Sequence, residues 1–437
     1  MTGSPAALVE LVNLFDRREA RIAIVGQGYV GLPLAMRAVE LGFSVTGYDT
    51  AAGRVDALRA GNSYVEDVSS EQLRSALESG YRATTDPADL AGFDVAIITV
   101  PTPLREGVPD LSFIETAASD LTPHLRPGVL VVLESTTYPG TTEELLRPAL
   151  ELSGRRAGTD FFLGYSPERM DPGNPKWSLA NTPKVVSGVD DDSLAAVTAF
   201  YSRLVDTVVP VASTAEAELV KLLENTFRHV NIALVNELAM FARDLGVDIW
   251  NAVDAAATKG FGFMPFTPGP GVGGHCLPVD PSYLAWRVER RLGHRFRFVE
   301  LANEVNSGMP DYVVRRAQAL LNDHGLSVKG SRILLIGLAY KAGTSDWRES
   351  PATSVARRFA ELGAEVRAHD AHVPGGAGLG PDVERVDCSI EELEAADLVV
   401  VLTAQEDLPY DDIADHARLV LDTRGSLRGR SFRGQVL

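Results

Sequence analysis

Cysteine and lysine are both scarce in this chain of 437 residues. The only cysteines are Cys276 and Cys388, too few for a disulfide framework or for a cysteine-based zinc cluster. A chain of this length predicts two to four domains and buries a core that needs no such staples. Only six of the 41 Lys and Arg residues are lysines, so the positions that use lysine are worth following.

Positive charge and long apolar runs are also missing. Lys and Arg number 41 against 59 Asp and Glu, a net charge of −18, which argues against a nucleic-acid binder and against adsorption to an anionic membrane. No run of 18 apolar residues is present, and residues 1–20 lack the features of a targeting segment. We therefore expect a cytoplasmic protein that contacts neither nucleic acid nor membrane.

The first half of the chain alternates short apolar runs with helical patterns. These runs lie at residues 21–25, 43–49, 95–100, 129–135 and 161–166. Several are rich in β-branched residues, which is typical of buried strands. Strands that alternate with helices predict a doubly wound α/β domain over roughly residues 20–205.

The middle of the chain is helical, and an α/β pattern then starts again. Residues 215–245 keep a helical periodicity for longer than a typical globular helix. A Gly/Pro-dense loop is expected at 260–281 and a second helical stretch at about 296–325. From residue 331 the order strand, glycine turn, helix, glycine, strand and aspartate repeats.

These patterns predict an α/β protein with two Rossmann-like doubly wound domains. A long central helix and a helical middle domain are expected to join them. The predicted regions are an N-terminal Rossmann domain at 1–210, a central helical domain at 211–325 and a C-terminal Rossmann-like domain at 326–437.

The sequence Gly26-x-Gly28-x-x-Gly31 joins the first strand to a helix, and Asp49 ends the next strand. This is the context that a dinucleotide-binding fingerprint requires, because glycines let the backbone approach a pyrophosphate at a helix N-terminus. Asp49 would bind the adenosine ribose and repel a 2′-phosphate, which favours NAD over NADP. Arg54 is close enough in sequence to accept such a phosphate. The alternative interpretation is a tight turn without a ligand.

Cys276 lies in a glycine-rich loop, Gly271-Val-Gly-Gly-His-Cys276-Leu-Pro-Val-Asp280. Backbone N–H groups near the sulfur favour the thiolate, which suits covalent catalysis on a carbonyl. Asp280 is placed to orient a water or a basic group. The alternative is a small buried hydrophobe, the usual behaviour of a free cysteine, and Cys388 is assigned to that class.

Two further motifs present charged side chains. Lys221, Asn225 and Arg228 fall at i, i+4 and i+7 of the long helix and share one face, which suits an anionic or hydroxyl-rich ligand. Glu168 and Arg169 follow a strand directly, where ligands of α/β sheets gather; they are a candidate base and a candidate anion ligand. The alternatives are a solvated helix face and a salt-bridged turn.

Lys341 and Arg348 lie at the first strand–helix junction of the second α/β unit, which lacks the three-glycine fingerprint. An anion such as uridine diphosphate would fit between them, and the alternative is a basic cluster at a domain interface. Thr102 and Thr136 also lie just past expected strand ends.

Seven motifs occur in the order found in the UDP-sugar 6-dehydrogenases. They are GQGYVGLPLA, VPTPL, ESTTYPGTT, YSPERMDPGN, KLLENTFRHVNIALVNE, PGPGVGGHCLPVDP and GLAYKAGTSDWRESPA. From about residue 20 to 425 the chain resembles this family. ESTTYPGTT and SPER resemble the N-acetylhexosamine members, and KGFGFMPF is most similar to the UDP-N-acetylglucosamine type. The resemblance favours that substrate, with UDP-N-acetylmannosamine or UDP-glucose as alternatives.

The resemblance implies a four-electron oxidation of C6 from alcohol to carboxylate with two NAD⁺ and no metal. Cys276 would add to the aldehyde as a thiohemiacetal, whose oxidation leaves a thioester that water hydrolyses. Lys221 would stabilise oxyanions or move protons. Asp280 would hold a water, and Glu168 would act as a base in hydrolysis.

The resemblance also implies two binding sets and an assembly. The NAD site would include Gly26, Gly28, Tyr29, Val30, Gly31, Asp49, Arg54, Thr102, Thr136 and Arg348. The UDP-sugar would be held by Arg169, Met170, Asn225, Arg228, Gly273, Tyr340, Lys341 and Arg424. A homodimer or higher homo-oligomer is implied. The rival functions are a silent sugar-nucleotide-binding protein and a two-electron alcohol dehydrogenase of the 6-phosphogluconate type.

Overall fold

The computed structural model describes residues 5–171, 174, 176–274, 276–375, 380 and 383–437. Of Pro5, Cys276 and Pro278 it describes the backbone only. Backbone contacts divide the chain into two compact units, one of Met1–Glu224 with Trp286–Gly293 and one of Asn225–Ala285 with His294–Leu437. The functional division at residues 210 and 325 stays a prediction.

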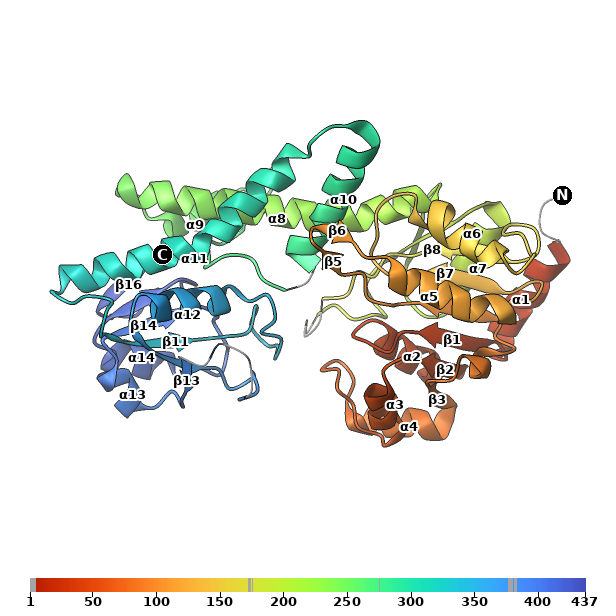
Figure 1. The fold of residues 1–437 in the computed structure, drawn as a ribbon, viewed down its shortest axis with the longest axis horizontal. Coiled ribbons are helices and arrows are strands. Elements are labelled where there is room, and N and C mark those ends of the chain that lie inside the picture. The colour runs from red at the N-terminus through yellow and green to blue at the C-terminus, as the bar shows by residue number, and fades with distance from the viewer. Residues whose placement is uncertain (1–4, 172–173, 175, 275, 376–379, 381–382) are drawn as a thin grey trace. The chain divides into compact units, whose positions relative to one another are not determined.

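The first unit is built on an eight-stranded sheet (Figure 1), in the order β10-β9-β8-β7-β4-β1-β2-β3. Its strands are β1 Arg21–Val25, β2 Ser44–Tyr48, β3 Tyr81–Thr84, β4 Val95–Ile98, β7 Leu130–Leu133, β8 Phe162–Tyr165, β9 Lys184–Gly188 and β10 Val208–Pro210, and a hairpin lies outside it, β5 Leu104–Arg105 and β6 Val108–Pro109. Six neighbouring strands of this order run parallel to one another: β8, β7, β4, β1, β2 and β3. Their near-continuous burial is that of a sheet covered on both faces.

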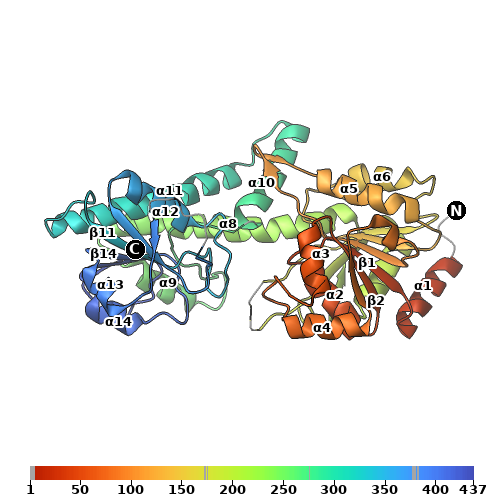
Figure 2. The same cartoon turned by 60° about the horizontal axis from the view of Figure 1, so that its bottom comes forward.

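Helices cover both faces of this sheet. They are α1 Pro5–Arg17, α2 Gly31–Glu40, α3 Ala52–Arg59, α4 Ser70–Ser79, α5 Ser112–Leu121, α6 Arg147–Glu151, α7 Asp191–Tyr201 and the start of α8 Thr214–Asp244. Side chains of α1 to α4 and α7 share one apolar cluster with Ile22 and Ile24 of β1. Those of α5 and α6 share the other with Ala23 and Val25. Figure 2 shows α2, α3 and α4 apart from α5 and α6.

Local sequence signals set several helix ends. The Ser69 hydroxyl accepts the Gln72 N–H at 3.0 Å and begins α4, and Gly80, with φ +122°, follows its last turn. The Asp190 carboxylate caps α7 by accepting the Ser193 N–H at 2.7 Å. Short polar caps and a glycine after the last turn satisfy the unpaired groups of helix ends.

Strand β9 reverses the direction of the sheet. It pairs antiparallel with β8, Gly164 opposite Gly188 and Tyr165 opposite Ser187, while β10 runs parallel to β9. The described residues between β8 and β9 contain no helix, whereas a parallel return needs a long crossover connection. As a result Lys184, the first residue of β9, lies at the edge where the parallel strands end.

The second unit carries a six-stranded sheet in the order β13-β12-β11-β14-β15-β16, with every neighbouring pair parallel. Its strands are β11 Arg332–Ile336, β12 Glu365–His369, β13 Val383–Arg385, β14 Leu398–Val401, β15 Val420–Asp422 and β16 Gly434–Val436. The remaining helices are α9 Ile249–Ala257, α10 Cys276–Leu292, α11 Arg297–Asp323, α12 Pro351–Glu361, α13 Ile390–Ala395 and α14 Tyr410–His416. Side chains of α11 and α12 pack on one sheet face and those of α13 and α14 on the other.

Both sheets therefore have the doubly wound strand order, and the predicted fold class is confirmed. The predicted loop at 260–281 is wrong at its end, because α10 already begins at Cys276. Pro278 lies in the first turn, where a backbone N–H has no helical partner and a proline costs little. Pro281 lies farther inside the helix, so proline density did not exclude a helix there.

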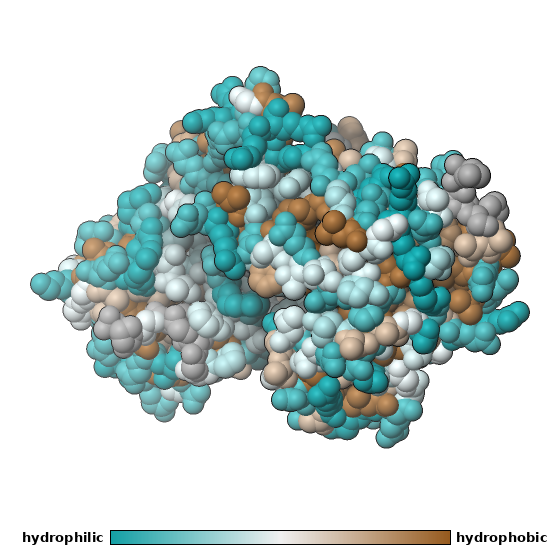
Figure 3. Space-filling view, turned by 45° about the vertical axis from the view of Figure 1, so that its right-hand side comes forward, coloured by the Kyte–Doolittle hydropathy of each residue, from teal (hydrophilic) through white to brown (hydrophobic). Residues whose placement is uncertain are grey.

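On the face shown in Figure 3 hydrophilic residues dominate, and hydrophobic ones form separate small groups. Within the described residues no helix has the length and apolar character needed to span a bilayer.

Candidate active site

The parallel strands of the first unit end in register. Val25 of β1, Ile98 of β4, Leu133 of β7 and Tyr165 of β8 are successive partners across the sheet. The segments that follow these four residues therefore leave the sheet along one edge. In doubly wound sheets this edge is where ligands bind.

The turn after β1 has the geometry of a dinucleotide-binding turn. Gly26 has φ +95°, and a Cβ on Gly31 would lie 1.9 Å from the Gly26 carbonyl oxygen. A Cβ on Gly28 would meet nothing within 4 Å. Two of the glycines are thus needed by the fold, while the third borders open space in which a pyrophosphate fits. The exposed Tyr29 and the half-buried Val30 lead into α2.

We expect Gly28→Ala and Gly31→Ala to separate cofactor binding from folding. Gly28→Ala should unfold within about 2 °C of the parent protein but bind NAD about 10–100-fold more weakly, because its methyl group enters the pyrophosphate space. Gly31→Ala should lose both binding and about 3 kcal/mol of stability through overpacking. Thermal unfolding and calorimetric titration with NAD measure both. Equal NAD affinity in Gly28→Ala and the parent would contradict the assignment.

Asp49 follows β2 and is nearly buried. Its carboxylate accepts the N–H groups of Gln27 and Ala51, both at 2.9 Å. Nη1 of Arg54 lies 3.5 Å from the same carboxylate. Each carboxylate oxygen can accept a second hydrogen bond, so these residues fit the adenosine ribose of NAD.

The loops after β4 and β7 are tied to each other and to α8. The Thr102 hydroxyl donates to the Thr136 carbonyl at 2.8 Å. Glu218 of α8 accepts the N–H groups of Gly140 and Thr142 at 2.6 and 2.8 Å, and the Thr142 hydroxyl at 2.7 Å. Burial raises the pKa of Glu218 to about 7 against these three donors. Glu218 was not predicted as a functional residue from the sequence, because its partners are far away in the chain.

Glu218 gives the fold a pH dependence with a definite sign. Its folded pKa of about 7 exceeds the ordinary value of 4.5, so the folded protein binds the proton more tightly and its stability falls as pH rises from 4.5 to 7. Glu218→Gln should remove this fall, which is at most about 3 kcal/mol. Urea unfolding of parent and variant from pH 4.5 to 8 tests this, with the exposed Glu71→Gln as control. Parallel pH profiles for parent and Glu218→Gln would contradict it.

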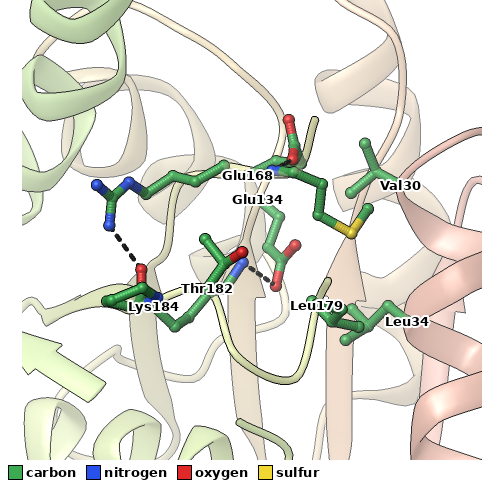
Figure 4. Close-up of a pocket in the computed structure, with 10 residues that line it drawn as sticks. Val30, Leu34, Glu134, Glu168, Leu179, Thr182 and Lys184 are labelled. Carbon is green, nitrogen blue, oxygen red and sulfur yellow. Dashed lines mark hydrogen bonds and ion pairs between the residues drawn. The ribbon is translucent and has the colours of Figure 1, made fainter. Parts of the chain in front are cut away.

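The loop after β8 brings the candidate base to a buried lysine. Oε2 of Glu168 lies 3.1 Å from Nζ of Lys221, and both side chains are largely buried. The Met170 N–H donates to the other Glu168 oxygen. Glu168, Arg169 and Met170 line one pocket with Val30 of the dinucleotide turn (Figure 4). Residues predicted from separate motifs thus come together.

Arg169 is occupied by protein groups. Its guanidinium contacts Glu224 with two nitrogens, at 2.6 and 3.2 Å. Nη1 donates to the Pro183 carbonyl at 2.6 Å. These are the contacts of a salt-bridged turn, and a substrate-binding role for Arg169 stays a prediction.

In the second unit, Asn225 donates to Asp280 at 2.6 Å and both side chains are buried. A buried hydrogen bond of this length holds the carboxylate in one orientation. Lys221 is buried as well, whereas Arg228 is exposed. The predicted helix face therefore consists of two buried residues and one at the surface.

Buried amides hold the start of the cysteine loop. The Asn236 side chain accepts the Gly269 N–H at 2.9 Å and donates to Asn306 of α11 at 3.0 Å. A Cβ on Gly269 would lie 2.3 Å from Nη1 of Arg424, so this arginine lies against the same loop. Burial lowers the pKa of Arg424. The two asparagines, like Glu218, were not singled out from the sequence.

The end of the same loop lies against Tyr340. A Cβ on Gly273 would approach Cβ of Tyr340 to 2.9 Å, and one on Gly274, where φ is +78°, would approach the ring to 2.8 Å. Any side chain there would displace Tyr340, so both positions require glycine. Cys276 follows two residues later, and its side chain lies outside the described residues.

The basic residues after β11 differ in environment. Arg348 is exposed and forms a bidentate pair with Asp346 at 2.8 and 2.9 Å, and Lys341 is half-buried. Their predicted ligand roles stay predictions. In the part of the chain that the structure describes, no three His, Cys, Asp or Glu residues are grouped to hold a metal ion.

Asp370 ends β12 as Asp49 ends β2, but its carboxylate is fully engaged. It accepts the N–H groups of Leu338, Ala339 and His372 at 2.7, 3.0 and 2.9 Å. Gln405 donates to both oxygens. Burial opposes ionisation here, yet these donors hold the pKa of Asp370 below its usual value.

Comparison with known families accounts for this arrangement. Family models match the NAD-binding domain at residues 20–205, the central domain at 215–308 and the UDP-binding domain at 334–429. The chain belongs to the UDP-glucose/GDP-mannose dehydrogenase family. As a member it is an NAD-dependent UDP-sugar dehydrogenase that acts on a CH–OH group.

Relatives within the UDP-glucose/GDP-mannose dehydrogenase family act on different sugars. The UDP-N-acetyl-D-mannosamine dehydrogenase of Pyrococcus horikoshii is 34% identical over 95% of this chain and 98% of its own. A solved structure of UDP-D-ManNAc dehydrogenase from that organism matches at the same identity and coverage with a TM-score of 0.85. The UDP-N-acetyl-D-glucosamine 6-dehydrogenase of Pseudomonas aeruginosa is 38% identical over 81% of this chain and 83% of its own.

Proposed function

We propose that this dehydrogenase oxidises C6 of a UDP-N-acetylhexosamine to the uronic acid, with UDP-N-acetylglucosamine preferred. The observation that carries the proposal is the Glu168–Lys221 pair, 3.1 Å apart, with Glu168 in one pocket with Val30 of the NAD turn. A carboxylate and an ammonium in contact provide a proton acceptor and a cation for a developing alkoxide.

The chain's own groups supply the covalent part of the reaction. Bound NAD⁺ supplies the hydride acceptor. Lys221 stabilises the oxyanion formed at C6, and the Cys276 thiolate adds to the aldehyde carbon to give a thiohemiacetal. After oxidation to the thioester, Glu168 takes a proton from the attacking water, and the carboxylate product leaves as the thiolate is restored. Asp280 orients that water.

The sugar preference rests on residues 259–266, KGFGFMPF. Phe261, Phe263 and Met264 are exposed there, and the Phe266 ring contacts Phe227 at a centroid distance of 5.8 Å. The segment resembles the UDP-N-acetylglucosamine type, and the 38% identity to such an enzyme supports the same choice. UDP-N-acetylmannosamine is the second candidate, because the relative matched over nearly its whole length uses that sugar.

A substrate panel tests the proposal. The purified protein is mixed with NAD⁺ and, separately, UDP-N-acetylglucosamine, its C2 epimer UDP-N-acetylmannosamine, and UDP-glucose. We expect two NADH per sugar consumed and the highest kcat/KM with UDP-N-acetylglucosamine. Absence of NADH with every sugar, or one NADH per sugar, would contradict the four-electron route. A higher kcat/KM for the epimer would move the assignment to UDP-N-acetylmannosamine.

We also propose that the enzyme is a cytoplasmic homodimer with functional regions at 1–210, 211–325 and 326–437. Apolar side chains stand exposed along the last part of α8 at Leu234, Leu238 and Phe241, and Leu245 follows directly after the helix. The alternating four- and three-residue steps suit helix pairing. A reducing compartment suits an enzyme that works through a thiolate. Sedimentation equilibrium should give twice the chain mass, and a monomer would contradict the dimer.

A further inference from the structure

The pocket below the candidate base contains a buried ion pair that the reaction does not use. Nζ of Lys184, on β9, lies 3.0 Å from the Glu134 carboxylate, which follows β7. Both side chains are at most 5% exposed. Figure 4 shows this pair in the same pocket as Glu168. Lys184 is one of only six lysines in the chain.

Tyr201 completes the environment of the pair. Its hydroxyl donates to the same Glu134 oxygen that contacts Lys184, and the lysine lies 5.1 Å from the centre of the Tyr201 ring. The positive charge thus contacts one carboxylate and one aromatic face. Burial raises the pKa of Tyr201 well above its ordinary value, so its hydroxyl remains a donor at neutral pH.

Lys184 also holds the backbone next to the candidate base. Its Nζ donates to the Pro167 carbonyl at 3.2 Å, and Pro167 immediately precedes Glu168. On the other side of Glu168, Arg169 donates to the Pro183 carbonyl at 2.6 Å, and Pro183 immediately precedes Lys184. These two hydrogen bonds tie residues 167–169 and residues 183–184 to each other in both directions, and we call this pair of contacts the clasp. Residue 168 is the one residue between the two attachment points.

The reversal of β9 makes this clasp possible. A strand parallel to β8 would present its last residue at the ligand-binding edge, whereas antiparallel β9 presents its first residue, Lys184. Stability alone is a weak reason for such a pair, because a buried ion pair often contributes no more than apolar residues of similar volume. A directed contact with one loop carbonyl is what an apolar residue cannot supply.

We propose that Lys184, with Glu134 as its counter-ion, is a positioning residue that holds the Glu168 carboxylate against Lys221. This inference rests on the proposed role of Glu168 as the base. The ammonium group fixes the carbonyl one residue before Glu168, and so it limits how far the carboxylate can move from the Lys221 nitrogen 3.1 Å away. A misplacement of about 1 Å near a reacting centre can cost about 100-fold in rate.

The central test variant removes the clasp without leaving a buried charge. The double variant Glu134→Gln/Lys184→Met is neutral at both positions and keeps an acceptor for Tyr201. We expect its kcat to fall at least about 10-fold, with the KM for NAD⁺ within about twofold of the parent because no NAD ligand is changed. The acid limb of the pH–kcat profile should shift by at least about 0.5 pH unit, whereas a purely structural loss would leave that limb in place.

Arg126→Met serves as a matched control. Arg126 also pairs with a carboxylate, Asp94, and donates to a backbone carbonyl, that of Phe93 at 2.9 Å. These contacts lie at the opposite end of β4 from the site, before Val95. Arg126→Met should lower the unfolding temperature while leaving kcat and the pH profile unchanged.

Two further outcomes decide the inference. If the double variant is folded and its kcat and acid limb match the parent, positioning by Lys184 is wrong. If it does not fold, Tyr201→Phe takes its place, because this variant keeps both charges and removes one hydrogen bond to Glu134. Tyr201→Phe must then shift the acid limb in the direction expected for the double variant. An unchanged acid limb overturns the inference. A parent protein that reduces no NAD⁺ with any UDP-sugar would instead overturn the proposed function.

Discussion

Replacing Cys276 by serine should lower the rate of uronate formation by about 1,000-fold or more. A serine hydroxyl is scarcely ionised at neutral pH, so it adds to an aldehyde far more slowly than a thiolate does. The first oxidation does not need the sulfur, and NAD binding should remain within about twofold of the parent because the predicted NAD ligands are unchanged. Mass spectrometry of the sugar product, together with NADH counted in a single turnover, measures each step.

Cys388→Ser is the control for this experiment. Cys388 is half-buried against the cluster of α13 and α14, and burial raises the pKa of its thiol to about 11. It is therefore a thiol at neutral pH, and its replacement should leave uronate formation unchanged. Full uronate production by Cys276→Ser would show that the carboxylate forms without a thioester.

Exchanging Asp49 for asparagine should raise the preference for NADP over NAD by about 100-fold, measured as the ratio of kcat/KM values, which corresponds to about 2.7 kcal/mol. The negative charge that repels a 2′-phosphate disappears. At the same time Arg54, which now lies 3.5 Å from the carboxylate, loses its counter-ion and becomes a phosphate ligand. Asparagine keeps the size of the side chain.

The second step of this test is Asp49→Asn/Arg54→Ala. If Arg54 supplies the phosphate contact, the double variant should lose most of the NADP activity gained by Asp49→Asn. Unchanged cofactor preference in the single variant would mean that Asp49 does not face the adenosine ribose.

The features predicted well from sequence are those encoded within short segments. The turn of Gly26, Gly28 and Gly31 needs only a strand before it, a helix after it and backbone sterics, and the structure has all three. The doubly wound fold class follows from the alternation of apolar runs and helices. The roles assigned to Glu168 and Lys221 stay predictions, although the structure places the two in contact.

The features that sequence could not reveal depend on distant partners. Lys184 meets Glu134 across 50 residues, and it does so only because β9 is reversed. No strand was predicted at residues 184–188, so its reversed direction could not be foreseen. Arg169 was interpreted as a possible anion ligand because its partner, Glu224, lies on a helix 55 residues later. The start of α10 at Cys276 was not predicted, because Pro278 and Pro281 were interpreted as part of a loop.

The locked carboxylate of Asp370 has a kinetic consequence. The enzyme must bind NAD⁺ and a sugar nucleotide at different sheets, although both sheets have the doubly wound strand order. A ribose hydroxyl that approached Asp370 would have to displace Gln405 and compete with three backbone N–H groups. Of these two acids only Asp49, at the first sheet, can accept a hydrogen bond from the ribose of a dinucleotide. We therefore expect that excess NAD⁺ does not inhibit the enzyme by competing with the sugar nucleotide at the second sheet.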